Sequence, residues 1–170
     1  MTSVSLDQVR EVFSYLQVPA RDTSWGGDFV KMARVESVDV NEVCPVIEFH
    51  IETKEWMNNM MGFVHGGCAT TMADNISTWA IMADPRYWKK SSEGSDVLAA
   101  ITNDFGVSRN LNLTFVRPIP LNSTIAFVVK VQSNTKRYTH LTFEIIDPKT
   151  KKQYVLGTHD KAKTNANAKI

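Results

Sequence analysis

The spacing of apolar residues predicts an amphipathic helix near the start of the chain. Ser5 and Gln8 have the spacing of a capping box, and Pro19 ends the helical period. The apolar positions recur every three or four residues and are Leu6, Val9, Val12, Phe13 and Leu16. Such a stripe is expected to pack across another element.

A second helix is predicted at 65–83, where apolar or small side chains occupy most positions. Those at helical spacing are Ala69, Met72, Ala73, Ile76, Trp79, Ala80 and Ala83. A helix that is apolar or small nearly all round is typical of a buried position. Pro85 is expected to end it.

Strands are predicted on both sides of this helix, because apolar and polar positions alternate there. The segments with this period are 29–35, 37–40, 46–51, 107–116, 124–134, 138–146 and 153–163. A hairpin turn is expected at Asn41 and Glu42, 89–96 is polar enough for a surface loop, and 97–102 is ambiguous. One buried helix among strands with short turns predicts an α+β fold, with an antiparallel sheet wrapped around the helix.

Composition narrows the classes of function. The chain has 170 residues, which suits a single domain, and its net charge of +1 offers no overall field for nucleic acid. Its two cysteines exclude a disulfide framework and a cysteine-rich zinc site. Histidines 50, 140 and 159 lie singly in predicted strands, so we expect no metal site. No apolar run is long enough to span a membrane.

Two features of the central helix bear on chemistry. Gly66 and Gly67 stand in its first turn, where backbone N–H groups lack helical partners. Without a Cβ, they either expose these N–H groups to a ligand oxygen or only allow close packing. Asp74 lies among positions that look buried. It is either a desolvated general base or a structural carboxylate that bonds Ser77 or Thr78 or faces solvent.

Two other groups are candidates for chemistry. Cys68 lies in the same first turn, where the helix dipole favours the thiolate, and His65 precedes it by three residues. No third group is evident to orient the histidine, so we do not expect a nucleophilic cysteine. Arg137 and Lys136 form a basic pair at a predicted turn. Such pairs are usually solvated, although one can hold a phosphate.

Residues 59–67 read NMMGFVHGG and residues 74–78 read DNIST. Together they resemble the N-x-x-G-x-x-H-G-G…D motif of the hotdog-fold acyl-CoA thioesterases, above all the phenylacetyl-CoA thioesterase branch. A second block at 106–118, with Ser108 and the run NLTF, is similar to the strand after the central helix in that family. The likeness covers about residues 25–163. The sequence departs from the family pattern in a longer, more polar segment at 89–104 and in the added N-terminal helix.

The resemblance implies a hotdog fold and a set of site residues. The Gly66 N–H and the Asn59 side chain would polarise the thioester carbonyl. Asp74 would act as general base or nucleophile, Ser108 would orient the attacking water, and His65 would support the loop geometry. Substrate contacts are expected from Gly67, Arg137, Met61 and Phe63.

The implied function is an acyl-CoA thioesterase that needs no cofactor and assembles as a homodimer or a dimer of dimers. One alternative is a hotdog hydratase or dehydratase, which favours a histidine and a carboxylate poised on the acyl β-carbon. Another is a non-catalytic acyl-CoA-binding hotdog protein. The presence of both Gly66 and Asp74 favours the thioesterase.

We expect an N-terminal helical extension at 1–24, a hotdog domain at 25–163 and a flexible tail at 164–170. The first residues lack an apolar secretion core. The final Ala168-Lys169-Ile170 is similar to the small, basic, aliphatic tripeptide that the peroxisomal import receptor reads. We therefore expect a peroxisomal location, and otherwise a cytoplasmic or mitochondrial one.

Removal of the last three residues tests this signal. We expect an N-terminally tagged full chain to give a punctate peroxisomal pattern and the truncated chain to be diffuse, because the receptor reads a free C-terminal tripeptide. Fluorescence imaging of both chains beside a peroxisomal marker measures the difference. The same diffuse pattern for both chains contradicts the signal.

Overall fold

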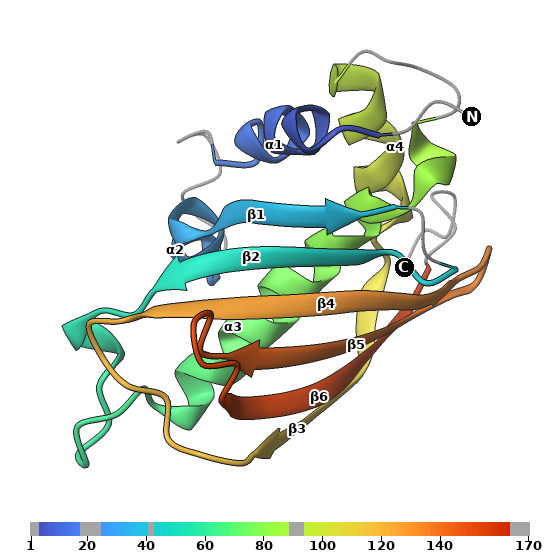
Figure 1. Cartoon of the computed structure of the whole chain (residues 1–170). Coiled ribbons are helices and arrows are strands. Elements are labelled where there is room, and N and C mark those ends of the chain that lie inside the picture. Colours follow the sequence, from blue (N-terminus) through green and yellow to red (C-terminus); the bar gives the residue numbers. More distant parts are fainter. Residues whose placement is uncertain (1–3, 18–24, 41–42, 89–93, 164–170) are drawn as a thin grey trace.

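A six-stranded antiparallel sheet forms the body of the molecule in the computed structural model, which describes residues 4–17, 25–40, 43–88 and 94–163. The strand order is β1-β2-β4-β5-β6-β3, so β1 and β3 are the two edges (Figure 1). The strand bounds are β1 Arg34–Asp39, β2 Val46–Glu52, β3 Val107–Phe115, β4 Thr124–Asn134, β5 Tyr138–Ile146 and β6 Gln153–Ala162. The predicted α+β architecture is confirmed.

The sequence located β2 to β6 to within a residue or so of their ends. It divided the first strand, because the alternation breaks at Glu36. The structure gives the reason: the register of β1 against β2 shifts between Val35 and Ser37, so a bulge interrupts the pleat there without ending the strand.

Helix α3, Gly66–Trp79, crosses one face of the sheet (Figure 1). Its buried positions are Ala69, Met72, Ala73, Ile76 and Ser77. The helix ends at Trp79, four residues before its predicted end, and two 3-10 turns follow, η3 Ala80–Ala83 and η4 Pro85–Tyr87. Burial is one-sided, contrary to prediction, since Thr71, Asp74, Asn75 and Thr78 remain partly exposed. These four polar residues form a second face of the helix.

Helix α1, Leu6–Ser14, has the predicted capping box of Ser5 and Gln8. It buries Val9, Val12 and Phe13, and the Phe13 ring lies 5.3 Å from that of Phe49 on β2. Figure 1 shows α1 beside α4, Gly94–Asp104, above the β1 edge of the sheet. The two helices therefore cover the same end of the core.

Residues 27–32 form helix α2, Gly27–Met32, where a strand was predicted. Gly26 adopts a left-handed conformation with φ 76° and starts this helix. A Cβ on Gly26 would stand 2.4 Å from Nδ2 of Asn75, so α2 lies directly against α3. The helix buries Phe29 and Val30. Packing on α3 outweighs the strand preference of this short apolar segment.

Helix α4 also replaces part of the loop expected at 89–96 and all of the ambiguous segment 97–102. Helix α4 already includes Gly94, and it buries Val97 and Ile101, which are one helical turn apart. The expected hairpin turn at Asn41 and Glu42, residues 89–93 and the tail from 164 lie outside the described residues. In the part of the chain that is described, no helix is long and apolar enough to cross a membrane.

Candidate active site

The loop before α3 brings a side-chain amide and a backbone N–H to one pocket. Asn59 Oδ1 accepts hydrogen bonds from the N–H groups of Met61 and Phe63, at 2.8 and 3.1 Å. The Asn59 Nδ2 donors and the Gly66 N–H have no hydrogen-bond partner among the described residues. Asn59 and Gly66 line the amide pocket, named here for these donors, and Phe63 and Phe115 form its apolar wall. The pocket therefore offers donors to a ligand oxygen.

His65 is the N-cap of α3. Its Nδ1 accepts the Gly67 N–H at 3.0 Å, and its backbone N–H donates to the Met57 carbonyl at 2.7 Å. These contacts tie the loop to the first turn of the helix. Because Gly67 already donates to His65, Gly66 provides the accessible N–H at this end of α3.

Asp74 and Ser108 meet in a second pocket. The Ser108 hydroxyl donates to Asp74 Oδ1 at 2.6 Å, linking α3 to the start of β3. The side chain of Asp74 is 47% exposed, so of the alternatives left open by the sequence the desolvated carboxylate is excluded. Its hydroxyl partner is Ser108, and the Thr78 hydroxyl bonds the Asp74 backbone carbonyl instead. A water-accessible carboxylate held by one hydroxyl has the form of a general base.

This carboxylate pocket, as we name it for Asp74, has a volume of about 620 Å³. Lys161 and Ser108 stand beside Asp74 in its wall, while Trp79 and Phe105 form an apolar part. The Trp79 and Phe105 rings meet edge to face, with centroids 4.1 Å apart. The pocket thus joins a polar group of residues to an aromatic wall.

His159 on β6 lies behind Asp74 and Ser108. Its Nε2 is 3.0 Å from Ser108 Oγ and 3.4 Å from Asp74 Oδ1, and its Nδ1 is 2.7 Å from Ser77 Oγ. The residue is completely buried. Burial, and next the charge of Lys161, lower the pKa of His159 to about 4, so the imidazole is neutral at pH 7. A neutral imidazole holds Ser108 from behind without adding charge.

Sequence reasoning missed His159 and Lys161, since it treated the histidine as a single residue in a strand. A usable signal was present: the two positions are two apart in a strand and so share one face. That face turns towards α3, where apolar residues are expected. Polar side chains at such positions indicate a site.

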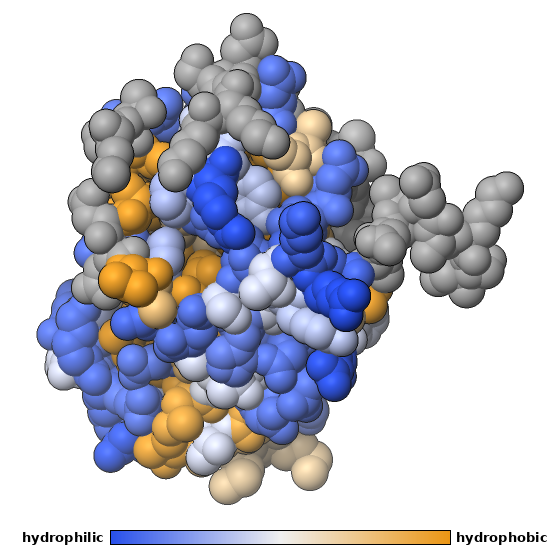
Figure 2. Space-filling model, turned by 90° about the vertical axis from the view of Figure 1, so that its right-hand side faces the viewer, coloured by the Kyte–Doolittle hydropathy of each residue, from blue (hydrophilic) through white to orange (hydrophobic). Residues whose placement is uncertain are grey.

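Other sequence-based candidates lie apart from these pockets. Arg137 is exposed in the turn between β4 and β5, at one end of the sheet. Figure 2 shows that the surface at this end of the molecule is mostly hydrophilic. Met61 is 79% exposed and does not line the amide pocket, although its backbone N–H donates to Asn59 Oδ1. Burial raises the pKa of the Cys68 thiol to about 11, opposite to the effect expected of the helix dipole. Cys68 is therefore a poor nucleophile at neutral pH.

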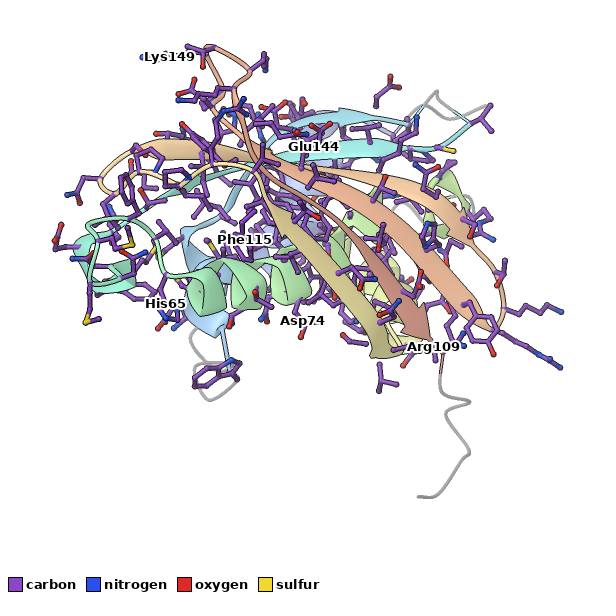
Figure 3. All side chains as sticks on the ribbon, turned by 90° about the horizontal axis from the view of Figure 1, so that it is seen from below. His65, Asp74, Arg109, Phe115, Glu144 and Lys149 are labelled. Carbon is purple, nitrogen blue, oxygen red and sulfur yellow. The ribbon has the colours of Figure 1, made fainter. Side chains whose placement is uncertain are left out.

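The two pockets share no lining residue. Figure 3 shows His65 at the start of α3 and Asp74 farther along the same helix. Gly66 and Asp74 are eight residues apart, which corresponds to about 12 Å along the axis. Within one chain, the donors and the carboxylate are therefore two separate half-sites. Among the described residues, no group of three His, Cys, Asp or Glu side chains could hold a metal ion.

The lowered pKa of His159 predicts a loss of stability in acid. The unfolded histidine binds a proton below about pH 6.5, whereas the folded one resists protonation down to about pH 4. The free energy of unfolding therefore has its full value with respect to His159 above about pH 6.5, and part of it is lost as the pH falls towards 4. We expect about 2 kcal/mol less unfolding free energy from this residue at pH 5 than at pH 7. Urea unfolding of wild type and His159→Gln at both pH values measures it, and an equal pH dependence of the two proteins contradicts it.

Comparisons with known proteins agree with this geometry. A sequence profile of the thioesterase superfamily matches residues 61–153, which is just over half of the chain. Human acyl-coenzyme A thioesterase 13 is 27% identical over 111 residues, which cover 65% of this chain and 68% of that protein.

Solved structures share the fold. Zebrafish thioesterase superfamily member 2 superposes with a TM-score of 0.69 at 22% identity, covering 95% of this chain and all of that one. A protein from Streptococcus pneumoniae TIGR4 described as a hypothetical thioesterase, solved with coenzyme A, has a TM-score of 0.59 at 12% identity. The match covers 79% of this chain and 88% of that one. The hotdog fold implied by the motif is confirmed, and the chain belongs to the thioesterase superfamily.

Proposed function

We propose that this protein is an acyl-CoA thioesterase that hydrolyses an acyl-CoA to a free acid and coenzyme A. The observation that carries the proposal is the pair of half-sites. One offers unpaired N–H donors at Gly66 and Asn59, and the other offers the exposed Asp74 carboxylate held by Ser108. Thioester hydrolysis needs both, because the carbonyl oxygen gains negative charge while water loses a proton.

In the proposed reaction, the donors of Gly66 and Asn59 hold the thioester oxygen. Asp74 takes one proton from a water molecule as the water oxygen bonds to the carbonyl carbon. The tetrahedral intermediate then collapses, the C–S bond breaks, and Asp74 returns the proton to the thiolate of coenzyme A. Ser108 fixes the direction of the carboxylate throughout. Only water is consumed, so the reaction calls for no cofactor.

The acyl group is assigned to the carboxylate pocket, whose apolar part is formed by Trp79 and Phe105. An acyl chain or ring that passes Asp74 would contact these two rings. The coenzyme A part would then extend from the amide pocket, and its phosphates need cations at the surface. Arg137 of a second copy remains a candidate for that contact.

The rival functions make different demands. A hydratase or dehydratase needs a group that protonates or deprotonates the acyl chain, and His159 is a poor acid at neutral pH because burial lowers its pKa to about 4. A non-catalytic binder has no use for a carboxylate aligned by a hydroxyl at 2.6 Å. Both observations favour hydrolysis.

We further propose that each active site is built from two chains. A carbonyl carbon and its attacking water lie within about 3–3.5 Å, whereas Gly66 and Asp74 of one helix are about 12 Å apart. Antiparallel α3 helices of a two-fold dimer would bring Gly66 of one chain to Asp74 of the other.

The edge strand supports the same arrangement. Strand β3 has a neighbour, β6, on one side, and in the described part of the chain its other edge is open. Ser108 near its start lines the carboxylate pocket, and Phe115 at its end lines the amide pocket. Antiparallel pairing of two β3 strands about their centres would set Ser108 of one chain opposite Thr114 of the other, next to Phe115. The proposed pairing of α3 and that of β3 are therefore compatible with one two-fold axis.

Replacement of the base tests the chemistry. We expect Asp74→Asn to lower kcat by about 10²–10⁴-fold with little change in KM, because the amide keeps the volume but cannot accept the proton. Free-thiol release from acyl-CoAs of varied length measures turnover, and the wild type must hydrolyse at least one of them. Cys68→Ala is the control and should be nearly silent. Equal kcat for Asp74→Asn and wild type contradicts the assigned role.

A mixture of two inactive variants tests the shared site. Asn59→Ala and Asp74→Asn chains, unfolded together in equal amounts and refolded, should form about half mixed dimers. Each mixed dimer has one site with both lesions and one with neither, so about a quarter of wild-type activity should return. Sites within single chains would restore nothing. Native mass spectrometry confirms that mixed dimers form, and their inactivity would defeat the model.

A further inference from the structure

Three ionisable side chains turn towards the interior at alternate positions, two in β6 and one directly after its last residue: His159, Lys161 and Lys163. Lysine is almost never buried without a partner. Lys163 has one, since its ammonium group lies 2.5 Å from Asp104. Lys161 is only 5% exposed, yet no carboxylate of the described residues lies within 4.0 Å of it. The mechanism above does not use this buried cation.

The Lys161 ammonium contacts two hydroxyl groups of the site. It donates to Thr78 Oγ1 at 3.0 Å and to Ser108 Oγ at 3.4 Å. Because Ser108 also lies 2.6 Å from Asp74, the ammonium and the carboxylate are at most about 6 Å apart. The other charged or titratable groups around it are neutral His159 on β6 and Lys31 on α2, which lies 3.7 Å from Asp28.

These contacts restrict where the Ser108 proton goes. An ammonium group only donates hydrogen bonds, and an ionised carboxylate only accepts them. Ser108 Oγ therefore accepts from Lys161 and donates its proton to Asp74. The Ser77 hydroxyl donates to the Ala73 carbonyl at 2.6 Å, so it accepts from His159 Nδ1, which carries the proton of the neutral ring. His159 Nε2, 3.0 Å from Ser108 Oγ, is then a second acceptor for the Ser108 proton, which the structure gives to Asp74.

Resting on the function proposed above, we infer that Lys161 is a positioning residue for hydrolysis. Its N–H donor occupies the Ser108 oxygen on one side and leaves the hydroxyl proton to Asp74, while its positive charge faces that carboxylate. The Lys161 charge also contributes, after burial, to the lowered pKa of His159, which keeps the imidazole neutral. Without Lys161, Ser108 is free to donate to His159 in place of Asp74.

Substitution of Lys161 in the full chain tests this inference. Lys161→Met keeps most of the side-chain volume and removes both charge and donor. We expect the acid limb of its kcat profile to move to higher pH by about one unit and kcat at the plateau to fall about 10-fold. KM should stay within about twofold, because the residue acts on the base. Lys161→Arg retains the charge and should keep the acid limb of wild type.

Lys163→Met is the matched control, since it removes a similarly buried lysine two residues further on, directly after the end of β6. It should lose stability to urea while its pH profile stays that of wild type. A folded Lys161→Met protein, shown by circular dichroism, whose acid limb does not move overturns the inference. So does a Lys163→Met protein whose limb moves equally, because the effect would then be merely structural.

A second measurement needs no turnover and no substitution of Lys161. The ¹⁵N shifts of His159 in the wild-type protein, assigned by comparison with His159→Gln, report which ring nitrogen holds the proton. We expect the Nδ1–H tautomer at pH 7. An Nε2–H tautomer overturns the inference, because His159 could then not compete with Asp74 for the Ser108 proton. Absence of thiol release from wild type with every acyl-CoA counts instead against the proposed function.

Discussion

The close packing of α3 on the sheet is the constraint on which the rest of the molecule depends. Ala69 and Ala73 allow the helix to approach, and Met72 and Ile76 fill the space against the strands. Loss of a large side chain here, such as Ile76, would cost about 2–5 kcal/mol. The same contact sets the height of the helix over β3 and β6, and so fixes the distances on which the proposed site relies.

Two polar bridges use that fixed height. One is the hydrogen bond from Ser108 to Asp74, and the other is the contact of Ser77 with His159. Both span helix and sheet at 2.6–2.7 Å, so a shift of α3 by one ångström would break them. Apolar packing thus determines the position of α3, and that position brings the polar groups of the proposed site within hydrogen-bonding distance.

The sequence predicted most of the sheet and the central helix because their periods are long and regular. It failed at α2, where six residues with two adjacent apolar side chains fit a strand equally well. The positive φ of Gly26 and its contact with Asn75 decide that segment, and both depend on residues about 50 positions away. Local pattern holds no such information.

For the site, the motif led to Asn59, Gly66, Asp74 and Ser108, and the geometry groups them in two pairs. The motif does not include His159 and Lys161. Their role depends on contacts of β6 with β3 and α3, which are neighbours in the fold but far from β6 in the sequence. The apolar neighbours of Asp74 left a buried and a solvent-facing carboxylate both open, and the structure places it on the polar face of α3. Helical periodicity alone distinguishes that face poorly when small residues occupy much of the helix.

Two surfaces of the single chain are open: the edge of β3 and the polar face of α3. A nine-residue edge strand such as β3 invites pairing with another chain, and the polar face of α3 beside it is half exposed. In the proposed dimer, one two-fold axis pairs the strands and also joins Asp74 to the donors of the other chain. Pairing of β3 would then fix how far those donors stand from the carboxylate. Activity would depend on the register of that pairing, since a slip of two residues moves the opposing groups by about 6–7 Å, more than a hydrogen bond tolerates.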